Sequence, residues 1–334
     1  RARAFGPPCS GEVPRETSSQ RHTGGCWDSP AGWPGEPRLG VMPTRRDVLV
    51  TMPQLVAELA GDAPPALLDV RWTLGEEPGS GRQRYAAGHL PGAVFLDLES
   101  ALTRHTGDPR DGRHPLPDLD VLRDSLAAAG VRAGQKIVLY DEPGSFAAGR
   151  AWWVLRWVGL PARVLDGGVR AWTAAGYPLE SLEAPGPAPT LGPADALPRL
   201  VAGYLPTLSA DDAASAPGRG VLVDVRAPER FRGEVEPIDP IAGHIPGAIN
   251  LPVAGLFAAD GRLPDEATLR ERLAPALAAA EAGREVAAYC GSGVSAAQAV
   301  LALASLGVQA GLFPGSWSAW SNDPTRPVAT ALLP

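Results

Sequence analysis

One cysteine of the chain stands in a sequence context suited to nucleophilic chemistry. Cys290 follows a short apolar run, 285–289, that predicts a strand, and a helix of small residues is predicted from about Ser295. Between them, Gly291 and Gly293 can adopt backbone angles that other residues avoid, so the loop can curl with successive N–H groups pointing inward. Together with the helix N-terminus, these groups would form a cradle for negative charge. We expect the cradle to stabilise a thiolate, or a terminal persulfide anion, on Cys290.

Cys290 could instead be a small buried hydrophobic residue, as free cysteines commonly are. The order of strand, cysteine, Gly-x-Gly and helix favours the functional interpretation. The other two cysteines, Cys9 and Cys26, lie in a Gly-, Pro-, Arg- and Ser-rich stretch, 1–41, that has no hydrophobic period. We expect this stretch to be disordered and assign its cysteines no role. Met42 stands just before the first patterned segment, so the tail need not belong to the native protein.

The chain repeats itself, with four short blocks returning in the same order. Two blocks of the first half recur 155 residues later, and two more recur at offsets of 149 and 148. The paired blocks are 67–71 with 222–226, 88–93 with 243–248, 137–141 with 286–290, and 168–172 with 316–320. In this alignment Asp141 occupies the place of Cys290. We therefore expect one catalytic half and one scaffold half that completes the cleft.

Each half alternates short apolar runs with helical patterns, which predicts a parallel sheet covered by helices on both faces. In such a sheet, ligands bind at the carboxyl ends of the strands. The predicted strands include 66–70, 136–140 and 163–165, and the predicted helices include 119–129, 145–158, 265–282 and 295–306. We predict a disordered tail over 1–41, a non-catalytic domain over 42–181, a Pro- and Ala-rich linker over 182–199 and a catalytic domain over 200–334.

The composition narrows the class of protein further. A net charge of −7 and a sequence pI near 5.3 argue against a nucleic-acid-binding protein, which normally carries a basic patch. Three cysteines cannot form a disulfide framework for 334 residues, and neither they nor the histidines have metal-ligand spacing. No apolar run reaches the roughly 18 residues that span a bilayer, and the first forty residues lack the apolar core of a secretory signal. We expect a cytoplasmic protein that uses no metal or organic cofactor.

From about Asp47 to Trp320 the chain resembles the tandem-domain rhodanese family, which comprises thiosulfate and 3-mercaptopyruvate sulfurtransferases. The loop over 290–296, Cys-Gly-Ser-Gly-Val-Ser-Ala, is similar to the mercaptopyruvate type, which has Cys-Gly-Ser-Gly-Val-Thr. The thiosulfate type typically carries Arg and Lys where this chain has Gly291 and Ser292. Phosphatases with a related fold need a longer loop that ends in Arg, and the lack of Arg here disfavours phosphoryl transfer. The resemblance implies two tandem rhodanese-like domains.

The resemblance also implies a binding residue for the anionic group of the sulfur donor. Arg230 matches a family arginine in that role, and a guanidinium suits a carboxylate or sulfonate because two parallel N–H groups can engage two oxygens. Without the resemblance, Arg230 would be taken for a solvated surface residue. Mercaptopyruvate enzymes usually place a second arginine just after a Glu-Pro pair, where this chain has Ile238. Arg232 is a candidate to compensate.

Further site residues follow from the resemblance alone. Ser292 matches a serine proposed to activate the cysteine or polarise the substrate, and Glu99 matches the Asp that works with it. His114 matches a first-half histidine that faces the cleft, and Trp72 matches an aromatic residue near its mouth. The alternatives are structural, such as a solvated carboxylate for Glu99 and packing for Trp72. The remaining loop residues assigned to substrate binding are Gly291, Gly293, Val294 and Ser295.

Several other residues are expected to be structural. His89 and His244 occupy matching turns of both halves, although only one half has the cysteine, so we expect each histidine to fix its turn by hydrogen bonding. Asp69 and Asp224 end equivalent strands and are assigned no catalytic role. The tryptophans, three of them on the predicted helix 145–158, are expected to pack in the core and between the domains.

These observations predict a sulfurtransferase with a ping-pong mechanism. The Cys290 thiolate would attack the outer sulfur of 3-mercaptopyruvate or thiosulfate and release pyruvate or sulfite. The persulfide would pass its sulfur to cyanide in an assay, or to a thiol such as thioredoxin or glutathione in the cell. Gly291 and Ser292 favour mercaptopyruvate, whereas Ile238 favours thiosulfate or mixed use. The alternatives are a non-enzymatic persulfide carrier that relays sulfur to a partner and, less favoured, an arsenate reductase or phosphatase.

Overall fold

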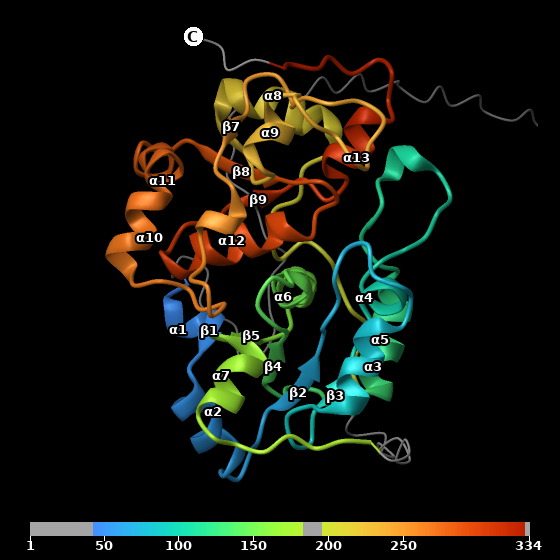
Figure 1. Ribbon diagram of the computed structural model, residues 1–334, viewed down its shortest axis with the longest axis vertical. Coiled ribbons are helices and arrows are strands. Elements are labelled where there is room, and N and C mark those ends of the chain that lie inside the picture. Colours follow the sequence, from blue (N-terminus) through green and yellow to red (C-terminus); the bar gives the residue numbers. More distant parts are fainter. Residues whose placement is uncertain (1–42, 183–195, 331–334) are drawn as a thin grey trace, which may run out of the picture.

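The structure is a computed structural model that describes residues 43–182 and 196–330. The predicted disordered tail, 1–41, lies outside the described residues, as does most of the predicted linker, 182–199. Each half of the chain contains one parallel sheet with helices packed around it (Figure 1). This architecture confirms the predicted fold class.

The first half is built on a five-stranded sheet in the order β1-β5-β4-β2-β3, and every neighbouring pair of strands is parallel. The central strand β4 consists of Ile, Val, Leu and Tyr, all buried, as a parallel strand covered on both faces requires. The strands are β1 (Leu49–Val50), β2 (Ala66–Asp69), β3 (Val94–Phe95), β4 (Ile137–Tyr140) and β5 (Ala162–Leu165). The helices are α1 (Arg45–Val48), α2 (Met52–Leu59), α3 (Ser80–Ala87), α4 (Leu98–Ala101), the short η1 (Pro109–Asp111), α5 (Leu119–Ala128), α6 (Ala147–Trp157) and α7 (Gly168–Ala174).

The second half repeats this plan with a four-stranded parallel sheet in the order β7-β6-β8-β9. Its strands are β6 (Gly220–Asp224), β7 (Ile249–Asn250), β8 (Glu285–Tyr289) and β9 (Gly311–Leu312). Its helices are α8 (Ala210–Arg219), α9 (Pro228–Phe231), the short η3 (Val253–Gly255), α10 (Glu266–Arg272), α11 (Ala274–Glu281), α12 (Ser295–Ser305) and α13 (Ser316–Ser321). Of the helices in the described ranges, none is long and apolar enough to cross a membrane.

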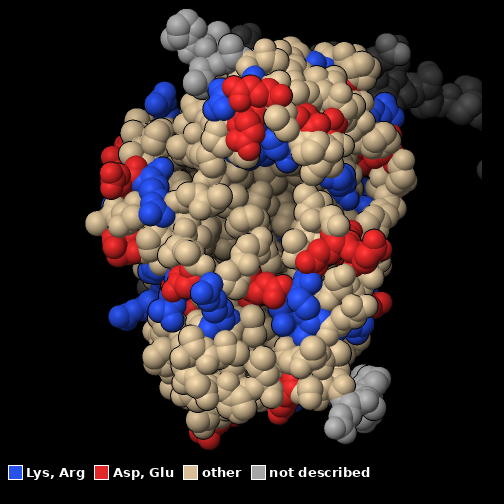
Figure 2. Space-filling view, viewed as in Figure 1, with Lys and Arg blue, Asp and Glu red and all other residues tan. Residues whose placement is uncertain are grey.

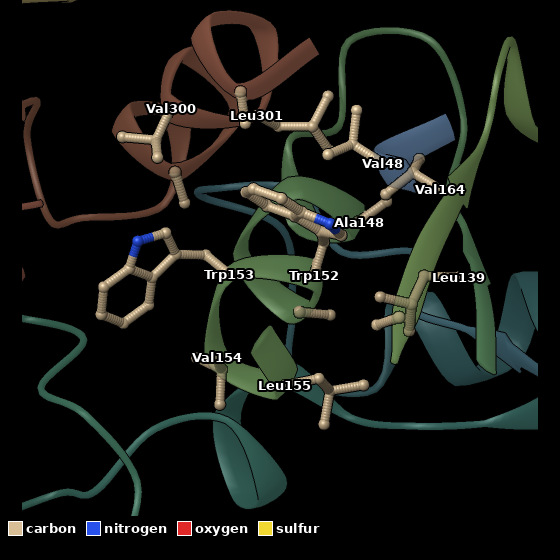
Figure 3. Packing of buried hydrophobic residues seen from close by; sticks show 14 of the residues in the cluster. Val48, Leu139, Ala148, Trp152, Trp153, Val154, Leu155, Val164, Val300 and Leu301 are labelled. Carbon is tan, nitrogen blue, oxygen red and sulfur yellow. The ribbon is translucent and has the colours of Figure 1, made fainter. Parts of the chain in front are cut away.

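The two halves share one hydrophobic core, in which α6 and α12 pack against each other. Gly149 permits this close contact, because a Cβ there would lie 2.8 Å from the Cα of Gln298. Trp152 and Trp153 extend from α6 and are buried in this core, with Leu301 of α12 above Trp152 (Figure 3). Burial of a large apolar side chain in such a core, for example Leu301, stabilises the fold by roughly 1.5–3 kcal/mol. The space-filling view shows the molecule hollowed near the middle of one face, with charged side chains of both signs around the hollow (Figure 2).

The single helix predicted over 265–282 is wrong, because the chain forms two helices there, α10 and α11. Pro275 stands in the first turn of α11. Proline has no N–H to donate to the preceding turn, and its ring disfavours helical angles at the residue before it, so a helix commonly ends there. The other predicted strands and helices named above differ from the observed bounds by no more than two residues at either end.

Matching polar contacts anchor the same turn in both halves. Asp69 accepts hydrogen bonds from Arg71, whose Nη2 also donates to the carbonyl oxygen of Gly88 at 2.7 Å. Asp224, Arg226 and Gly243 repeat this arrangement in the second half. The expected turn-fixing histidines follow the same pattern, with Nδ1 of His89 2.8 Å from the Tyr85 carbonyl oxygen and Nδ1 of His244 2.7 Å from that of Phe231.

Candidate active site

Cys290 lies at the carboxyl end of β8, where the chain turns into α12, and only 2% of its surface is exposed. Its Sγ accepts a hydrogen bond from the Gly293 N–H at 3.1 Å. Gly293 has a φ of +78°, and a Cβ there would lie 2.4 Å from the carbonyl oxygen of Pro314. Glycine is therefore required here, and its freedom turns a backbone N–H toward the sulfur. Val294 and Ser295 follow directly and begin α12.

The segment leading into α13 holds the backbone of the cysteine loop. The Cys290 N–H donates to Ser316 Oγ at 3.1 Å. Two N–H groups at the start of α13, those of Trp317 and Ser318, donate to the carbonyl oxygens of Cys290 and Gly291 at 2.9 and 2.8 Å. Ser316 has a φ of +53°, which is uncommon outside glycine, so the surrounding contacts hold a strained residue in place. The carbonyl groups of Cys290 and Gly291 thus face α13, while the Gly293 N–H faces the sulfur.

Polar side chains from both halves form a hydrogen-bonded chain that starts in the cysteine loop. Ser292 Oγ lies 2.7 Å from Nδ1 of His114, and His114 Nε2 lies 3.3 Å from Oε1 of Glu99. The same Glu99 oxygen accepts a hydrogen bond from Trp72 Nε1 at 2.9 Å. The rings of Trp72 and His114 meet edge-on, with centroids 5.2 Å apart. The structure thus brings together four residues that only the family resemblance had connected.

Burial sets the protonation of this chain. It lowers the pKa of His114, and the neighbouring Glu99 opposes that effect only in part. Burial also disfavours ionisation of Glu99, but hydrogen bonds from His114 and Trp72 outweigh it and lower the pKa of the carboxyl group. At neutral pH the imidazole is therefore neutral and the glutamate ionised. A neutral ring that donates its Nε2–H to Glu99 presents an unprotonated Nδ1, which can accept the proton of the Ser292 hydroxyl.

Two arginines, one from each half, lie beside Gly291. A Cβ built on Gly291 would be 3.0 Å from Nη2 of Arg113 and 3.8 Å from Nη1 of Arg230. Both arginines pair with Asp239, since Nη2 of Arg230 lies 3.3 Å from Oδ2 and Nη1 of Arg113 contacts Oδ1. Arg230 also donates from Nε and Nη2 to Glu236 at 3.1 and 2.5 Å. The arginine predicted to bind the donor thus borders the cysteine loop, held by two carboxylates.

The second arginine beside the loop is not one that the sequence indicated. Arg232 pairs with Glu234 at 2.7 Å on the surface, and the side chain of Ile238 is exposed. Arg113 takes the position beside Gly291 instead, although it comes from the other half of the chain. Its place immediately before His114 is the signal that could have pointed to it.

Arg150, on α6, is another residue that the sequence analysis missed. Its side chain is fully buried, and burial lowers its pKa to about 10, with the nearby Cys290 opposing this effect. Nη2 donates to the His114 carbonyl oxygen at 2.9 Å, and Nη1 donates to that of Gly293 at 3.4 Å. This cation joins the cysteine loop to the His114 segment, and its field favours negative charge on the Cys290 sulfur. The available signal was an arginine in the first turn of a helix that is otherwise rich in Ala and Trp.

A counterpart of the site, built around the first-half loop that aligns with the cysteine loop, lacks the reactive groups. Its cavity of about 450 Å³ is lined by the loop over 141–146, by residues of η3 and by Gln298 of α12. The aligned replacements are Asp141 for Cys290, Pro143 for Ser292, Ala254 for Glu99 and Leu263 for His114. Burial raises the pKa of Asp141 to about 7, against hydrogen bonds from the Ala148 N–H and from Ser145. The thiol, hydroxyl, carboxylate and imidazole of the site thus correspond to a buried carboxyl group and apolar residues in the counterpart.

The polar groups of the site are not arranged as a metal centre. Within residues 43–182 and 196–330, no group of three or more His, Cys, Asp or Glu side chains could hold a metal ion. A cavity of about 410 Å³ beside the hydrogen-bonded chain is lined by first-half residues, among them Trp72, Glu99 and His105.

Known proteins resemble this chain along most of its length. The family model for the rhodanese-like domain matches twice, over 52–175 and 209–323. A Mycobacterium tuberculosis protein that carries the name thiosulfate sulfurtransferase SseB is 46% identical over 289 residues, which cover 86% of this chain and 98% of the relative. A Pseudomonas aeruginosa protein named as a 3-mercaptopyruvate sulfurtransferase is 44% identical over 286 residues, which cover 84% of this chain and 98% of the relative.

A solved structure shows the same likeness in three dimensions. The crystal structure of SseA from Escherichia coli, described with the 3-mercaptopyruvate sulfotransferases, matches with a TM-score of 0.67 and 30% sequence identity, covering 80% of this chain and 98% of that one. Two rhodanese-like domains and relatives at 44% and 46% identity, matched over nearly their whole length, show that this chain belongs to the rhodanese family of sulfurtransferases.

Proposed function

We propose that this enzyme moves sulfane sulfur from a small anionic donor, 3-mercaptopyruvate or thiosulfate, to a thiophilic acceptor through a persulfide on Cys290. The observation that carries the proposal is the setting of the sulfur. Cys290 Sγ accepts the Gly293 N–H, and the same loop presents Ser292 hydrogen-bonded to His114. A backbone donor beside the sulfur stabilises the negative charge of a thiolate or of a terminal persulfide.

With 3-mercaptopyruvate, the Cys290 thiolate attacks the donor's sulfur. The new S–S bond forms as the donor's C–S bond breaks, and the electron pair of that bond passes to the carbon as the enolate of pyruvate. The enolate takes up one proton and the donor thiol loses one, so the step needs no oxidant or reductant. Ser292 and His114 are placed to move this proton, because the hydroxyl lies 2.7 Å from Nδ1 of a neutral ring. Glu99 then stabilises the imidazolium that forms.

With thiosulfate, the same attack breaks the donor's S–S bond and releases sulfite. In the second half-reaction the acceptor attacks the terminal persulfide sulfur and regenerates the Cys290 thiolate. Cyanide serves as the acceptor in an assay. In the cell the acceptor is a thiol such as glutathione or thioredoxin, and we place the enzyme in the cytoplasm.

The cysteine loop favours 3-mercaptopyruvate as the donor. Sulfite leaves without needing a proton, whereas the pyruvate enolate needs one, and the hydrogen-bonded chain from Ser292 to Glu99 supplies a proton path. Exposed Ile238 argues the other way, because it adds no cation for the donor's carboxylate. Comparing kcat/KM for the two donors decides the matter. We expect at least a tenfold preference for 3-mercaptopyruvate, about 1.4 kcal/mol, and a large preference for thiosulfate would overturn this choice.

Replacement of the nucleophile tests the function itself. Cys290→Ser should abolish turnover with both donors, while the double variant Cys9→Ser/Cys26→Ser, which removes the other two cysteines, should retain it. Appreciable transfer by Cys290→Ser would rule out the proposed nucleophile. A chain that loads one sulfur but never turns over with cyanide or thiols would instead be a persulfide carrier that relays sulfur to a partner protein.

A further inference from the structure

We propose that the cavity of about 450 Å³ around the first-half loop 141–146 binds a small organic cation, with an ammonium or amidinium head on an apolar body. The head would contact Asp141 and Gln298. The apolar body would contact Phe146 and Phe257. This inference goes beyond the proposed function, because these four residues belong neither to the cysteine loop nor to the hydrogen-bonded chain beside it.

The cavity has the size and the walls of a small-molecule site. Loop 141–146 and β5 line it from the first half, and η3, the residues that follow η3 and α12 line it from the second. Ligand sites commonly measure about 300–1,000 Å³, are mostly apolar and often lie between domains. Phe146 and Phe257 line this cavity and remain partly exposed, although both pack against the core. A ligand that covers the two rings would remove apolar surface from water.

An amide group in the cavity wall has an unpaired acceptor. Gln298 lines the cavity from α12, and only 8% of its surface is exposed. Its Oε1 is buried and accepts no hydrogen bond from any described residue. This oxygen lies against Gly149 in the first turn of α6, where a Cβ would overlap with it. A buried acceptor without a partner destabilises the structure that contains it, so an N–H donor of a ligand would relieve this cost.

A second acceptor lies on the same turn of α6. Oδ2 of Asp141 accepts the Ala148 N–H at 2.9 Å, and Ala148 directly precedes Gly149. The carboxyl group and the amide oxygen of Gln298 are therefore held against consecutive residues of one helical turn. Neighbouring acceptors with no donor between them match a head group that carries several N–H donors.

The charges around the cavity favour a cation over an anion. The residues that line it include three carboxyl side chains, Asp141, Glu142 and Asp166, and no lysine, arginine or histidine. Arg84 pairs with Glu142 at 2.7 Å. Arg45 pairs with Asp166 at 3.5 Å. Within the described part of the chain, Asp141 has no such cationic partner. An organic cation would compensate its charge, and the faces of the two phenylalanine rings also attract a cation.

Titration calorimetry with benzamidinium as the probe tests the inference. At pH ~8 most Asp141 carboxyl groups, with a pKa of about 7, are ionised. Benzamidinium should then bind wild type with a Kd of about 1 mM or below. Benzylammonium, a second cation on the same ring, should bind within about tenfold of that Kd. Benzamide has nearly the same shape without the charge and should bind at least about tenfold more weakly than benzamidinium.

Four variants locate the bound cation. Asp141→Asn should raise the Kd for benzamidinium about 10- to 100-fold, and Gln298→Met should raise it about 3- to 10-fold. Asp124→Asn is the matched control, because it removes a carboxylate whose side chain is 72% exposed on α5. This control and Cys290→Ser should each stay within about twofold of wild type, since neither changes the cavity.

Three results would overturn the inference. One is the absence of saturable binding for both cations, and another is equal affinity of wild type and Asp141→Asn for benzamidinium. The third is a loss of binding in Cys290→Ser, which would place the cation in the active site instead. Asp141→Asn decides the matter even if Gln298→Met does not fold. Sulfur loading of Cys290, measured separately by mass, tests the proposed function independently of all three results.

Discussion

Replacing Gly293 by alanine tests whether the cysteine loop depends on one backbone position. Gly293 has a φ of +78°, and alanine in this left-handed region lowers the free energy of unfolding by roughly 1–2 kcal/mol. The new Cβ would also lie 2.4 Å from the carbonyl oxygen of Pro314, so the backbone must shift. That shift draws the N–H away from Cys290 Sγ, which it now meets at 3.1 Å. A hydrogen bond to a charged group contributes about 1.5–3 kcal/mol.

Gly134→Ala is the matched control, since Gly134 has a φ of +73° and no atom lies within 4 Å of the Cβ it would gain. Urea unfolding should show a loss of about 1–2 kcal/mol for the control and roughly 2.5–5 kcal/mol for Gly293→Ala. The rate at which sulfur loads onto Cys290 should fall about 10- to 100-fold in Gly293→Ala and stay unchanged in the control. Equal stabilities and equal loading rates in the two variants would refute the conclusion that Gly293 turns its N–H toward the sulfur.

Three other perturbations have defined outcomes. Ser292→Ala and His114→Ala should each lower kcat with 3-mercaptopyruvate by about 100-fold. The double variant should be no slower than either single variant, because the two side chains act as one unit. If the losses of the two single variants instead add in the free energy of activation, measured by steady-state rates, they do not share one proton path. Because burial lowers the pKa of His114, kcat/KM should be constant above pH ~6.5, the ordinary pKa of histidine. It should fall only at lower pH, where the ring gains a proton. If kcat/KM already falls as the pH is lowered from above ~7, the ring is not neutral as described. The Asp141 carboxyl has a pKa of about 7 in the folded chain, so between pH ~4 and ~7 it keeps its proton there while the unfolded chain ionises it. The free energy of unfolding of wild type should therefore fall as the pH rises from about 4 to about 7 and change no further above that. Asp141→Asn should remove this loss and be more stable than wild type by up to about 4 kcal/mol in urea unfolding at pH ~8; parallel pH profiles of stability for the two chains would show that Asp141 is not the group responsible.

The fold and the nucleophile could be predicted because their signals are local in the chain. A buried parallel strand such as β4 is a short run of apolar residues, and a loop that turns a backbone N–H toward Cys290 requires a glycine at position 293. The internal repeat then showed that one plan serves both halves. The prediction over 265–282 failed for an equally local reason, since Pro275 divides a pattern that otherwise suits one helix.

The surroundings of Cys290 could not be predicted in the same way, because they depend on how the two halves pack. Ser292 and His114 are 178 positions apart, and they meet only because α6 and α12 cross at Gly149. No periodicity in the sequence specifies that crossing. The family resemblance supplied these two residues but not Arg113 or Arg150. Almost all of the chain's 30 basic residues are arginine, so residue type alone does not mark Arg113 or Arg150 as functional. Their positions in the folded structure distinguish them.

Mass spectrometry of the peptide that contains Cys290, after incubation with 3-mercaptopyruvate or thiosulfate and no acceptor, tests the central claim most directly. The proposed mechanism requires a gain of about 32 Da, the mass of one sulfur atom in a persulfide, located on Cys290 and removed by cyanide or a reducing thiol. Cys290→Ser should gain nothing at that position. An unmodified Cys290 in wild type under conditions of active sulfur transfer, or a gain that persists elsewhere in Cys290→Ser, would contradict the mechanism.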